Sequence, residues 1–388
     1  MKKMHKAIAA LVLATTAPAI MADVKVGFVG TLSGPSADVG RDQFDGFALA
    51  LEQLGGKLGG VAATVIREDD QQKPEAALGA VSKLLDRDKV DIITGLTFAN
   101  VLMAMQGKIA ATDVPFIGTV AGPSPTAGAQ CKPNLFVMSW QSDVPAEAVG
   151  KYLTDKGIKR ISTMTPNFVG GKDKISGLKR FYKGEIADEI YTPLNQLDFS
   201  AEITQISSSK PEVVYSFYPG GLGVTFVRQY QQAGLVTKTP LYTSNMIEGT
   251  GLDAMGSAAI GAIAGDTWTL GTANPQSKQF VAAFLKKYNR SPSAYAAFSY
   301  DAAVMLDAAV RSLKGDVSDR KALTRAIKQA QFKSVRGNFR FGSNNYPVQD
   351  YDIFQIVKGA ADKPEFKLVT AGVLKAHSDA YVGQCAMK

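Results

Sequence analysis

Histidine is rare in this 388-residue chain, with two copies only, His5 and His377. Hydrolytic triads of the Ser-His-Asp and Cys-His types need a histidine as base, and protein zinc sites commonly use one as a ligand. His5 lies in an N-terminal segment that we predict to be removed, and we interpret His377 as a polar surface residue. The chain is therefore not expected to be an enzyme of these types, and we predict no metal site.

The glycine signatures of nucleotide-binding enzymes are missing as well. Gly27 and Gly30 lack the G-x-G-x-x-G spacing of a dinucleotide turn, and Gly56-Lys57 is followed by Leu58 where a phosphate-binding loop needs Ser or Thr. No G-x-S-x-G nucleophile elbow occurs. We predict no cofactor and no catalytic residue, and we interpret the acidic run 68–70 as a solvated turn.

The N-terminus has no hydrophobic run long enough for a membrane anchor. The apolar stretch 7–17 is shorter than the roughly 18 residues that a spanning helix needs. It follows Lys2, Lys3 and Lys6 and precedes the small residue Ala22, which is the order of a cleavable signal peptide. We predict a signal peptide over 1–22 and a mature chain exported to the periplasm.

Cysteine is as rare as histidine, with Cys131 and Cys385 only. In an oxidising compartment an even pair indicates one disulfide, which we predict between these two residues.

Excess positive charge is small and scattered. The formal net charge of +8 includes three signal-peptide lysines, which leaves 8 − 3 = +5 for the mature chain. No aromatic residues alternate with the basic groups, so we expect no nucleic-acid partner.

Predicted strands and helices alternate along most of the chain. This order is typical of an α/β protein whose parallel sheets are covered by helices on both faces. Strands are expected at 24–32, 62–67, 90–95, 114–117, 161–165, 189–194, 212–217 and 240–243, and helices at 44–54, 74–87, 101–111, 145–156, 175–183, 201–208 and 223–232. Helices then fill most of 277–330, and a β-rich tail follows from 338.

Four loops at the ends of predicted strands are rich in small or polar residues. Parallel sheets bind ligands at the carboxyl ends of their strands, where helix N-termini present unpaired N–H groups. Four such loops favour a shared anion-accepting cleft, although each alone is also explained by the needs of a tight turn. They lie at 31–35, 96–100, 120–125 and 166–171.

Several segments together are similar to those of one transport family. They read KVGFVGTLSGP (25–35), EDDQQKPE (68–75), DKVDIITG (88–95), LDFSAEIT (197–204) and KPEVVY (210–215). With them the chain resembles, over nearly its whole mature length, the periplasmic solute-binding proteins of the branched-chain amino acid (Leu/Ile/Val-type) ABC importer family.

This resemblance implies the type I periplasmic binding protein fold, in which two doubly wound parallel-sheet lobes are joined by a three-segment hinge. Lobe 1 would comprise 23–141 plus 270–343. Lobe 2 would comprise 142–269 plus 344–388, with a C-terminal β-tail returning toward the hinge. A monomer is expected to close around one small ligand and deliver it to an inner-membrane ABC permease.

The resemblance also implies a ligand site at the loops of the first lobe. Where amino-acid binders have a serine for the ligand carboxylate, this chain has Ala99, which offers only its backbone N–H. Ser124 is expected to take over as carboxylate donor, and the small Val39 leaves room for a larger ligand. The remaining residues expected here are Phe98, Asn100, Val120 and Gly122.

The second lobe lacks a clear counterpart of the acid that holds an amino acid's ammonium group. Asn245 or Met246 stands in its place, and we interpret the nearby Glu248 as a surface residue. Burying an ammonium without an anion costs several kcal/mol. We therefore favour an aromatic or other non-amino organic acid, with Phe168, Tyr218 and Trp268 joining Phe98 around it. The alternatives are a branched-chain amino acid held by Glu248, and a ligand-sensing domain.

Overall fold

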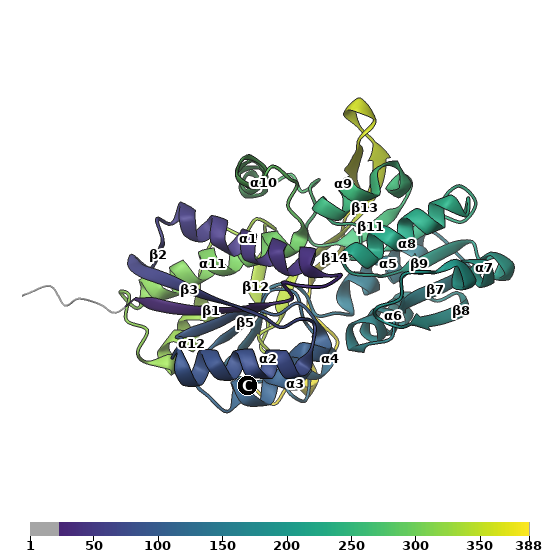
Figure 1. Cartoon of the computed structure of the whole chain (residues 1–388). Helices are drawn as coiled ribbons and strands as arrows, with labels where there is room; N and C mark the ends of the chain where they lie inside the picture. The colour runs from purple at the N-terminus through teal and green to yellow at the C-terminus, as the bar shows by residue number, and fades with distance from the viewer. Residues whose placement is uncertain (1–22, 388) are drawn as a thin grey trace, which may run out of the picture.

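The structure, a computed structural model, describes residues 23–387, so the predicted signal peptide over 1–22 lies outside the described residues. Two β-sheets, each covered by helices, form two units side by side (Figure 1). We name the unit around the first sheet lobe A and the unit around the second sheet lobe B. Between residues 23 and 387, no helix is both long and apolar enough to cross a membrane.

Lobe A contains a six-stranded sheet in the order β2-β3-β1-β4-β5-β6. All neighbours pair in parallel except β2 and β3. Val24 and Val26 of β1 face one core and Val29 faces the other, as a parallel strand buried on both sides requires. The strands are β1 (Val24–Gly30), β2 (Lys57–Leu58), β3 (Val61–Asp69), β4 (Ile92–Gly95), β5 (Phe116–Gly118) and β6 (Leu135–Val137).

Helices cover both faces of this sheet. One face carries α1 (Ala37–Gln53), α11 (Ala294–Ser312) and α12 (Arg320–Gln329), with α10 (Pro275–Tyr288) packed outside α1. The other carries α2 (Pro74–Ser82), its π-helical extension (Lys83–Arg87) and α3 (Ala99–Ala110), and the short α4 (Ser124–Ala127) follows β5.

Lobe B is built on an eight-stranded sheet in the order β12-β13-β11-β10-β9-β7-β8, with β14 paired to β13. Its strands are β7 (Arg160–Pro166), β8 (Glu185–Thr192), β9 (Val213–Ser216), β10 (Leu241–Thr243), β11 (Ile263–Asp266), β12 (Phe339–Phe341), β13 (Pro347–Lys358) and β14 (Pro364–His377). Helices α5 (Val144–Asp155) and α6 (Val169–Phe181) cover one face; α7 (Ser200–Ser209), α8 (Gly221–Gln232) and α9 (Gly249–Met255) cover the other. The β13–β14 hairpin projects beyond the sheet at the top of Figure 1.

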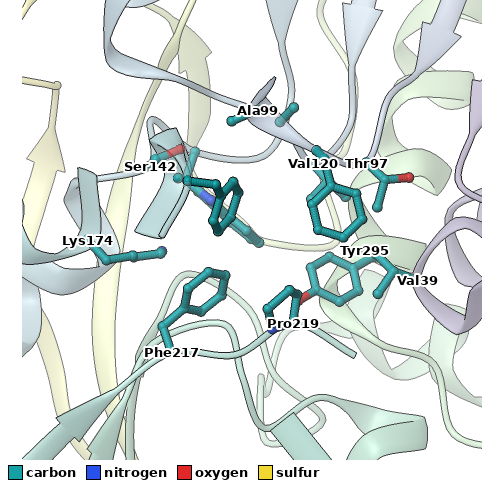
Figure 2. A pocket seen from close by; sticks show the side chains of 14 residues that line it. Val39, Thr97, Ala99, Val120, Ser142, Lys174, Phe217, Pro219 and Tyr295 are labelled. Atoms are coloured by element: carbon teal, nitrogen blue, oxygen red, sulfur yellow. The ribbon is translucent and has the colours of Figure 1, made fainter. Parts of the chain in front are cut away.

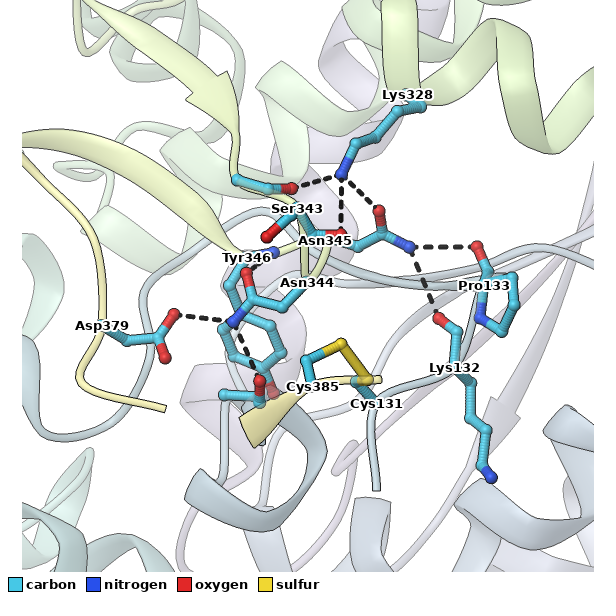
Figure 3. The surroundings of a disulfide bond; sticks show 12 residues. Cys131, Lys132, Pro133, Lys328, Ser343, Asn344, Asn345, Tyr346, Asp379 and Cys385 are labelled. Atoms are coloured by element: carbon cyan, nitrogen blue, oxygen red, sulfur yellow. Dashed lines mark hydrogen bonds between the residues drawn. A yellow bond between two sulfur atoms is a disulfide. The ribbon is translucent and has the colours of Figure 1, made fainter. Parts of the chain in front are cut away.

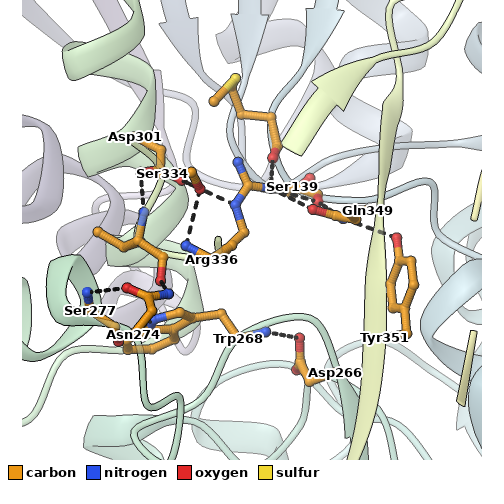
Figure 4. A network of polar contacts seen from close by, with 12 residues as sticks. Ser139, Asp266, Trp268, Asn274, Ser277, Asp301, Ser334, Arg336, Gln349 and Tyr351 are labelled. Atoms are coloured by element: carbon orange, nitrogen blue, oxygen red, sulfur yellow. Dashed lines mark hydrogen bonds and ion pairs between the residues drawn. The ribbon is translucent and has the colours of Figure 1, made fainter. Parts of the chain in front are cut away.

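The chain passes between the lobes at 138–143, 267–274 and 330–338, and a buried arginine in the third passage, Arg336, ties it to the first (Figure 4). Arg336 has no exposed side-chain surface, and its Nε donates to Asp301 Oδ2 at 3.1 Å. Its Nη1 donates to the carbonyl of Met138 and to Gln349 Oε1. Gln349 in turn donates to the carbonyl of Ser139 at 2.7 Å. Because a buried charge needs such partners, the network holds the crossing segments against α11.

Most predicted elements are confirmed, and the differences have physical reasons. The strands β6 and β11 were not predicted because three or four residues show no periodicity. Helix α6 begins at Val169 instead of 175, because Gly170 and Gly171 belong to the helix. A Cβ at Gly171 would lie 2.0 Å from the carbonyl oxygen of Pro166, so this glycine permits close packing of helix on strand.

The interpretation of 68–70 as a solvated turn is wrong. Asp70 is fully buried, and its Oδ1 accepts a hydrogen bond from Thr31 Oγ1 at 2.6 Å. Asp69 accepts from the backbone N–H of Leu32 at 2.9 Å. Both carboxylates therefore fasten the loop after β1. The residue limits given for the two lobes stay a prediction.

The predicted disulfide between Cys131 and Cys385 is present, with the Cα atoms 5.7 Å apart (Figure 3). It fastens the C-terminal tail, which is the segment that follows β14, to lobe A. Tyr381 packs on the core beneath α3, and Asn344 Nδ2 donates to Asp379 Oδ2 at 2.9 Å. The disulfide thus ties the C-terminal tail covalently to the loop between α4 and β6.

We expect the double variant Cys131→Ser, Cys385→Ser to fold with a lower melting temperature. The bond closes a loop with a sequence separation of 254 residues, and losing such a constraint on the unfolded chain typically costs about 2–5 kcal/mol. Thermal unfolding without reductant measures the difference. A thiol assay on unreduced, denatured protein should find no free thiol, and two thiols per chain would contradict the pairing.

Candidate ligand-binding site

A cavity of about 460 Å³, including its opening to solvent, lies where the two lobes meet (Figure 2). Both lobes and the first crossing segment contribute to its wall. The lining residues are Val39, Thr97, Phe98, Ala99, Val120, Ala121, Trp140, Ser142, Phe168, Gly170, Lys174, Phe217, Pro219 and Tyr295.

Aromatic rings form much of the wall. Phe98 of lobe A and Phe168 of lobe B meet edge to face, with ring centroids 6.1 Å apart. Trp140 packs edge-on against Phe298 at 4.9 Å, which fixes its ring beside the cavity. Flat apolar walls of this kind accept a planar ring or a branched aliphatic group.

One charged side chain, Lys174, lines the cavity. It lies in the first half of α6, is 2 % exposed, and reaches between Trp140 and Phe217 (Figure 2). Its Nζ lies 5.4 and 5.2 Å from the centroids of these two rings and donates to Asn245 Oδ1 at 2.5 Å. An ammonium has three N–H donors, and the described residues supply this one hydrogen-bond acceptor. The others are available to a ligand.

The position of this ammonium is set from lobe B. Asn245, in a left-handed conformation with φ 54°, donates from Nδ2 to Asp266 Oδ2 at 2.8 Å. Its backbone carbonyl accepts from the hydroxyl of Tyr295 at 2.8 Å. Asn245 is therefore held on two sides, and it fixes Lys174 in turn.

Burial dominates the ionisation of this cluster. It lowers the pKa of Lys174 to about 7, against the opposing effect of four carboxylates. It raises the pKa of Asp173 to about 7 and that of Asp266 to about 6. The four carboxylates near Lys174 are Asp266, Asp143, Asp173 and Glu248.

Two helices also begin at the cavity. The residues that precede α3 and α6, Phe98 and Phe168, make no side-chain capping hydrogen bond. Ala99, the first residue of α3, and Gly170, the second of α6, line the cavity, and N–H groups in the first turn of a helix have no intrahelical acceptor. Unpaired N–H groups and the helix dipole both favour an anion there.

Four of the predicted ligand contacts, Phe98, Ala99, Val120 and Phe168, do line the cavity. Ser124 does not: its hydroxyl and N–H both donate to Asp173, at 2.8 and 2.9 Å.

The other five predicted contacts also lie outside the lining, and direct contact with a ligand stays a prediction for all ten residues. Asn245 acts on Lys174, as described above. Tyr218 is buried in the lobe B core, where its hydroxyl lies 2.9 Å from that of Thr192. Trp268 donates to Ser277 Oγ at 2.9 Å. Gly122 lies against the backbone of the first crossing segment, and Asn100 is in the first turn of α3.

The interpretation of Glu248 as a surface residue is wrong. Its side chain is buried, and Oε2 accepts from the backbone N–H of Ala294 at 2.8 Å.

Sequence reasoning missed Lys174, Trp140, Phe217 and Tyr295. A signal for Lys174 exists, because Gly170, Lys174 and Leu178 share one face of α6 once the helix is known to begin at Val169. All three are buried. Within residues 23–387, no group of three His, Cys, Asp or Glu side chains is arranged to hold a metal ion.

Comparisons with known proteins agree with this geometry. The chain is similar to the solute binding protein of an ABC transporter from R. palustris, solved in complex with benzoate: the identity is 29%, the TM-score is 0.88, and 94% of this chain and 100% of that chain are covered. It is similar to an ABC transporter substrate-binding protein from Sphaerobacter thermophilus, with 26% identity, a TM-score of 0.84, and 90% and 98% covered.

Sequence relatives include the Leu/Ile/Val-binding protein homolog 6 of Brucella melitensis biotype 1, which is 26% identical over 340 residues, 84% of this chain and 85% of that protein. The sequence model of the family described as Periplasmic binding protein matches residues 23–361. With two helix-covered sheets and a cavity between them, the chain belongs to the periplasmic binding protein family.

Proposed function

We propose that this chain is the substrate-binding component of an ABC importer and captures a small carboxylic acid, aromatic or otherwise without an amino group, between its lobes. The observation that carries the proposal is the lining of the cavity. Of the 14 described residues that form it, Lys174 alone is charged, and aromatic rings surround it. Such a cavity matches one negative charge attached to an apolar body.

Each part of the ligand has a counterpart in the wall. The carboxylate pairs with the Lys174 ammonium and receives further hydrogen bonds from the N–H groups at the start of α3 or α6. The body of the ligand packs against Phe98, Phe168 and Phe217. Closure excludes water, so these hydrogen bonds form in a lower dielectric and are stronger there. No bond is made or broken.

An amino acid is a weaker match to this cavity. Its ammonium group would need an anion, and none of the described residues that line the wall is acidic. The relative from R. palustris, solved with benzoate, supports the acid. The names of the Leu/Ile/Val-binding relatives favour a branched-chain amino acid as the second candidate.

Family membership supports the remaining parts of the proposal. They are a periplasmic location, a monomer that binds one ligand, and an inner-membrane permease as the partner that receives it.

Closure would be secured by a contact beside the cavity. Ser124 of α4, in lobe A, donates twice to Asp173 of α6, in lobe B. Asp173 is the neighbour of Lys174 in sequence. The first half of α6 thus carries both the ligand's counter-ion and a latch between the lobes.

Replacing Ser124 by Ala should weaken binding of a ligand such as benzoate about tenfold or more. The variant loses one hydrogen bond to a carboxylate, a contact typically worth about 1.5–3 kcal/mol. Titration calorimetry measures affinity, and small-angle scattering measures compaction on binding. Ser176→Ala, at an exposed serine of the same helix, is the control. Equal affinity in both variants would show that the contact between Ser124 and Asp173 does not contribute to binding.

Lys174→Gln should lower the affinity for benzoate by a factor of about 10–150, because the carboxylate loses a charge-assisted hydrogen bond. Lys172→Gln makes the same charge change at an exposed site of α6 and should bind normally. Thermal unfolding of each variant separates loss of the site from loss of the fold. If leucine but no organic acid raises the melting temperature of the natural chain, the proposal is wrong and the second candidate stands.

Affinity for benzoate should also fall as the pH rises above about 7. Burial lowers the pKa of Lys174 to about 7, so the free protein loses the ammonium above that pH, while a benzoate-type acid stays ionised. The dissociation constant then rises by up to about tenfold per pH unit. Calorimetry between pH 6 and 9 tests this, with Lys174→Gln expected to show no such slope. A constant affinity across this range in the natural chain would show that the lysine charge is not used.

A further inference from the structure

The C-terminal tail, residues 378–387, crosses from one lobe to the other. It leaves lobe B at the end of β14 and reaches lobe A, where Cys385 is bonded to Cys131 in the loop between α4 and β6 (Figure 3). Three segments already carry the chain between the lobes, so the tail is a fourth connection. In contrast to the other three, it depends on a disulfide.

On the side of lobe A the tail is held by packing as well as by the disulfide. The ring of Tyr381 packs against the core that contains β4 and β5. The tail also lies directly against Gly128, which follows α4: a Cβ added there would come within 3.3 Å of the Tyr381 side chain and 3.1 Å of Gln384 Oε1. The end of α4 and the tail are therefore in close contact.

On the side of lobe B the same tyrosine is held by its hydroxyl. The hydroxyl donates to Oδ2 of Asp143, the residue that precedes α5, at 2.8 Å. Arg180 Nη2 donates to this carboxylate oxygen at 2.9 Å and to the tyrosine hydroxyl at 3.3 Å. The Asp143 side chain has no exposed surface. Tyr381 thus packs on lobe A with its ring and bonds to lobe B with its oxygen.

A second polar contact holds the place where the tail begins. His377, the last residue of β14, has its Nε2 2.7 Å from Oε2 of Glu147 in α5. The other carboxylate oxygen of Glu147 pairs with Arg180. The lobe B end of the tail is therefore attached to both α5 and α6 through charged and polar groups.

The tail joins two helices that also meet at the cavity. Arg180 lies in the last turn of α6, and the first half of this helix carries Lys174 and Asp173. Asp173 contacts Ser124 at the start of α4. When the lobes open, α4 moves away from α6, so the Tyr381 hydroxyl has to leave its lobe B partners. The disulfide keeps a released hydroxyl near them, at a high effective concentration, and so favours its return.

We propose that the C-terminal tail is a strap that favours the closed arrangement of the lobes, and that thiol–disulfide exchange at Cys131–Cys385 releases it. A dithiol reductant attacks one sulfur and the S–S bond breaks. Both cysteines become thiols, and the reductant is oxidised to its own disulfide as two electrons and two protons pass to the protein. Cys385 is partly exposed. The strap goes beyond the proposed function, because it controls how firmly a ligand is held, whatever the ligand's chemistry.

Reducing the folded natural chain tests the strap without a substitution. We expect dithiothreitol to lower the affinity for benzoate about tenfold, because closure no longer retains a hydrogen bond to a charged group. Small-angle scattering should show that the ligand-free protein expands. The double variant Cys131→Ser, Cys385→Ser should show both effects without reductant and should not respond to it. If a thiol assay finds two free thiols while affinity and size stay the same, the inference is wrong.

A variant that keeps the disulfide locates the effect in the tail. Tyr381→Phe retains the ring on lobe A and loses the hydroxyl, so we expect weaker benzoate binding and a more expanded ligand-free protein. Tyr191→Phe is the matched control, because its hydroxyl donates to Glu189 Oε1 at 2.9 Å within β8 and does not link the lobes. Binding and size that do not differ between the two variants would overturn the inference.

Failure of the strap differs from failure of the proposed function. If benzoate binds and depends on Lys174, but reduction has no effect, the function stands and the strap falls. If benzoate does not bind, the function is wrong and scattering alone decides about the strap: expansion of the ligand-free protein on reduction supports it, and an unchanged size refutes it.

Discussion

A buried lysine ammonium governs the chemistry of this protein. Removing such a charge from water costs several kcal/mol unless partners compensate it. Among residues 23–387, Lys174 has one direct hydrogen-bond partner, Asn245, two aromatic faces, and four carboxylates within electrostatic range. Burial still lowers the pKa of Lys174 to about 7, so the ammonium persists up to about neutral pH, with N–H groups left for a ligand. In the proposed function a carboxylate ligand completes this arrangement, and a neutral ligand does not.

The rest of the fold holds this lysine and the residues around it in fixed relative positions. Asp266 lies at the end of β11, directly before the second crossing segment, and it holds Asn245. Arg336 and Asp301 join the first and third crossing segments to α11, the helix that carries Tyr295 to the cavity wall. The same buried polar contacts therefore set the relative position of the lobes and the positions of the protein groups at the cavity. Since such contacts are strongly directional, they favour a small number of defined lobe arrangements.

Much of the fold follows from patterns that a single sequence carries. Apolar strands and amphipathic helices alternate with enough regularity to predict both sheets, and the two cysteines to predict the disulfide. The ligand site is harder, because its residues come from strands and helices distant in the chain. Lys174 looks like a surface lysine, with Lys172 two positions before it, until the start of α6 is known. Ser124 has the residue type of a ligand contact, but Asp173, which faces it from the other lobe, takes both its donors. No local pattern reveals such a partner.

Recognition and closure are linked by how the polar groups are divided between the lobes. Lobe A brings the N–H groups at the start of α3, whereas lobe B brings the Lys174 ammonium and the N–H groups of α6. An anion that contacts both sets is bound fully only when the lobes meet, so its charge stabilises the closed form over an open one. Asp173 directly precedes Lys174 in α6. Lobe closure that brings Lys174 to the ligand therefore also brings Asp173 into contact with Ser124. In the proposed function the ligand's carboxylate therefore links the two lobes, and a molecule without a carboxylate lacks this link.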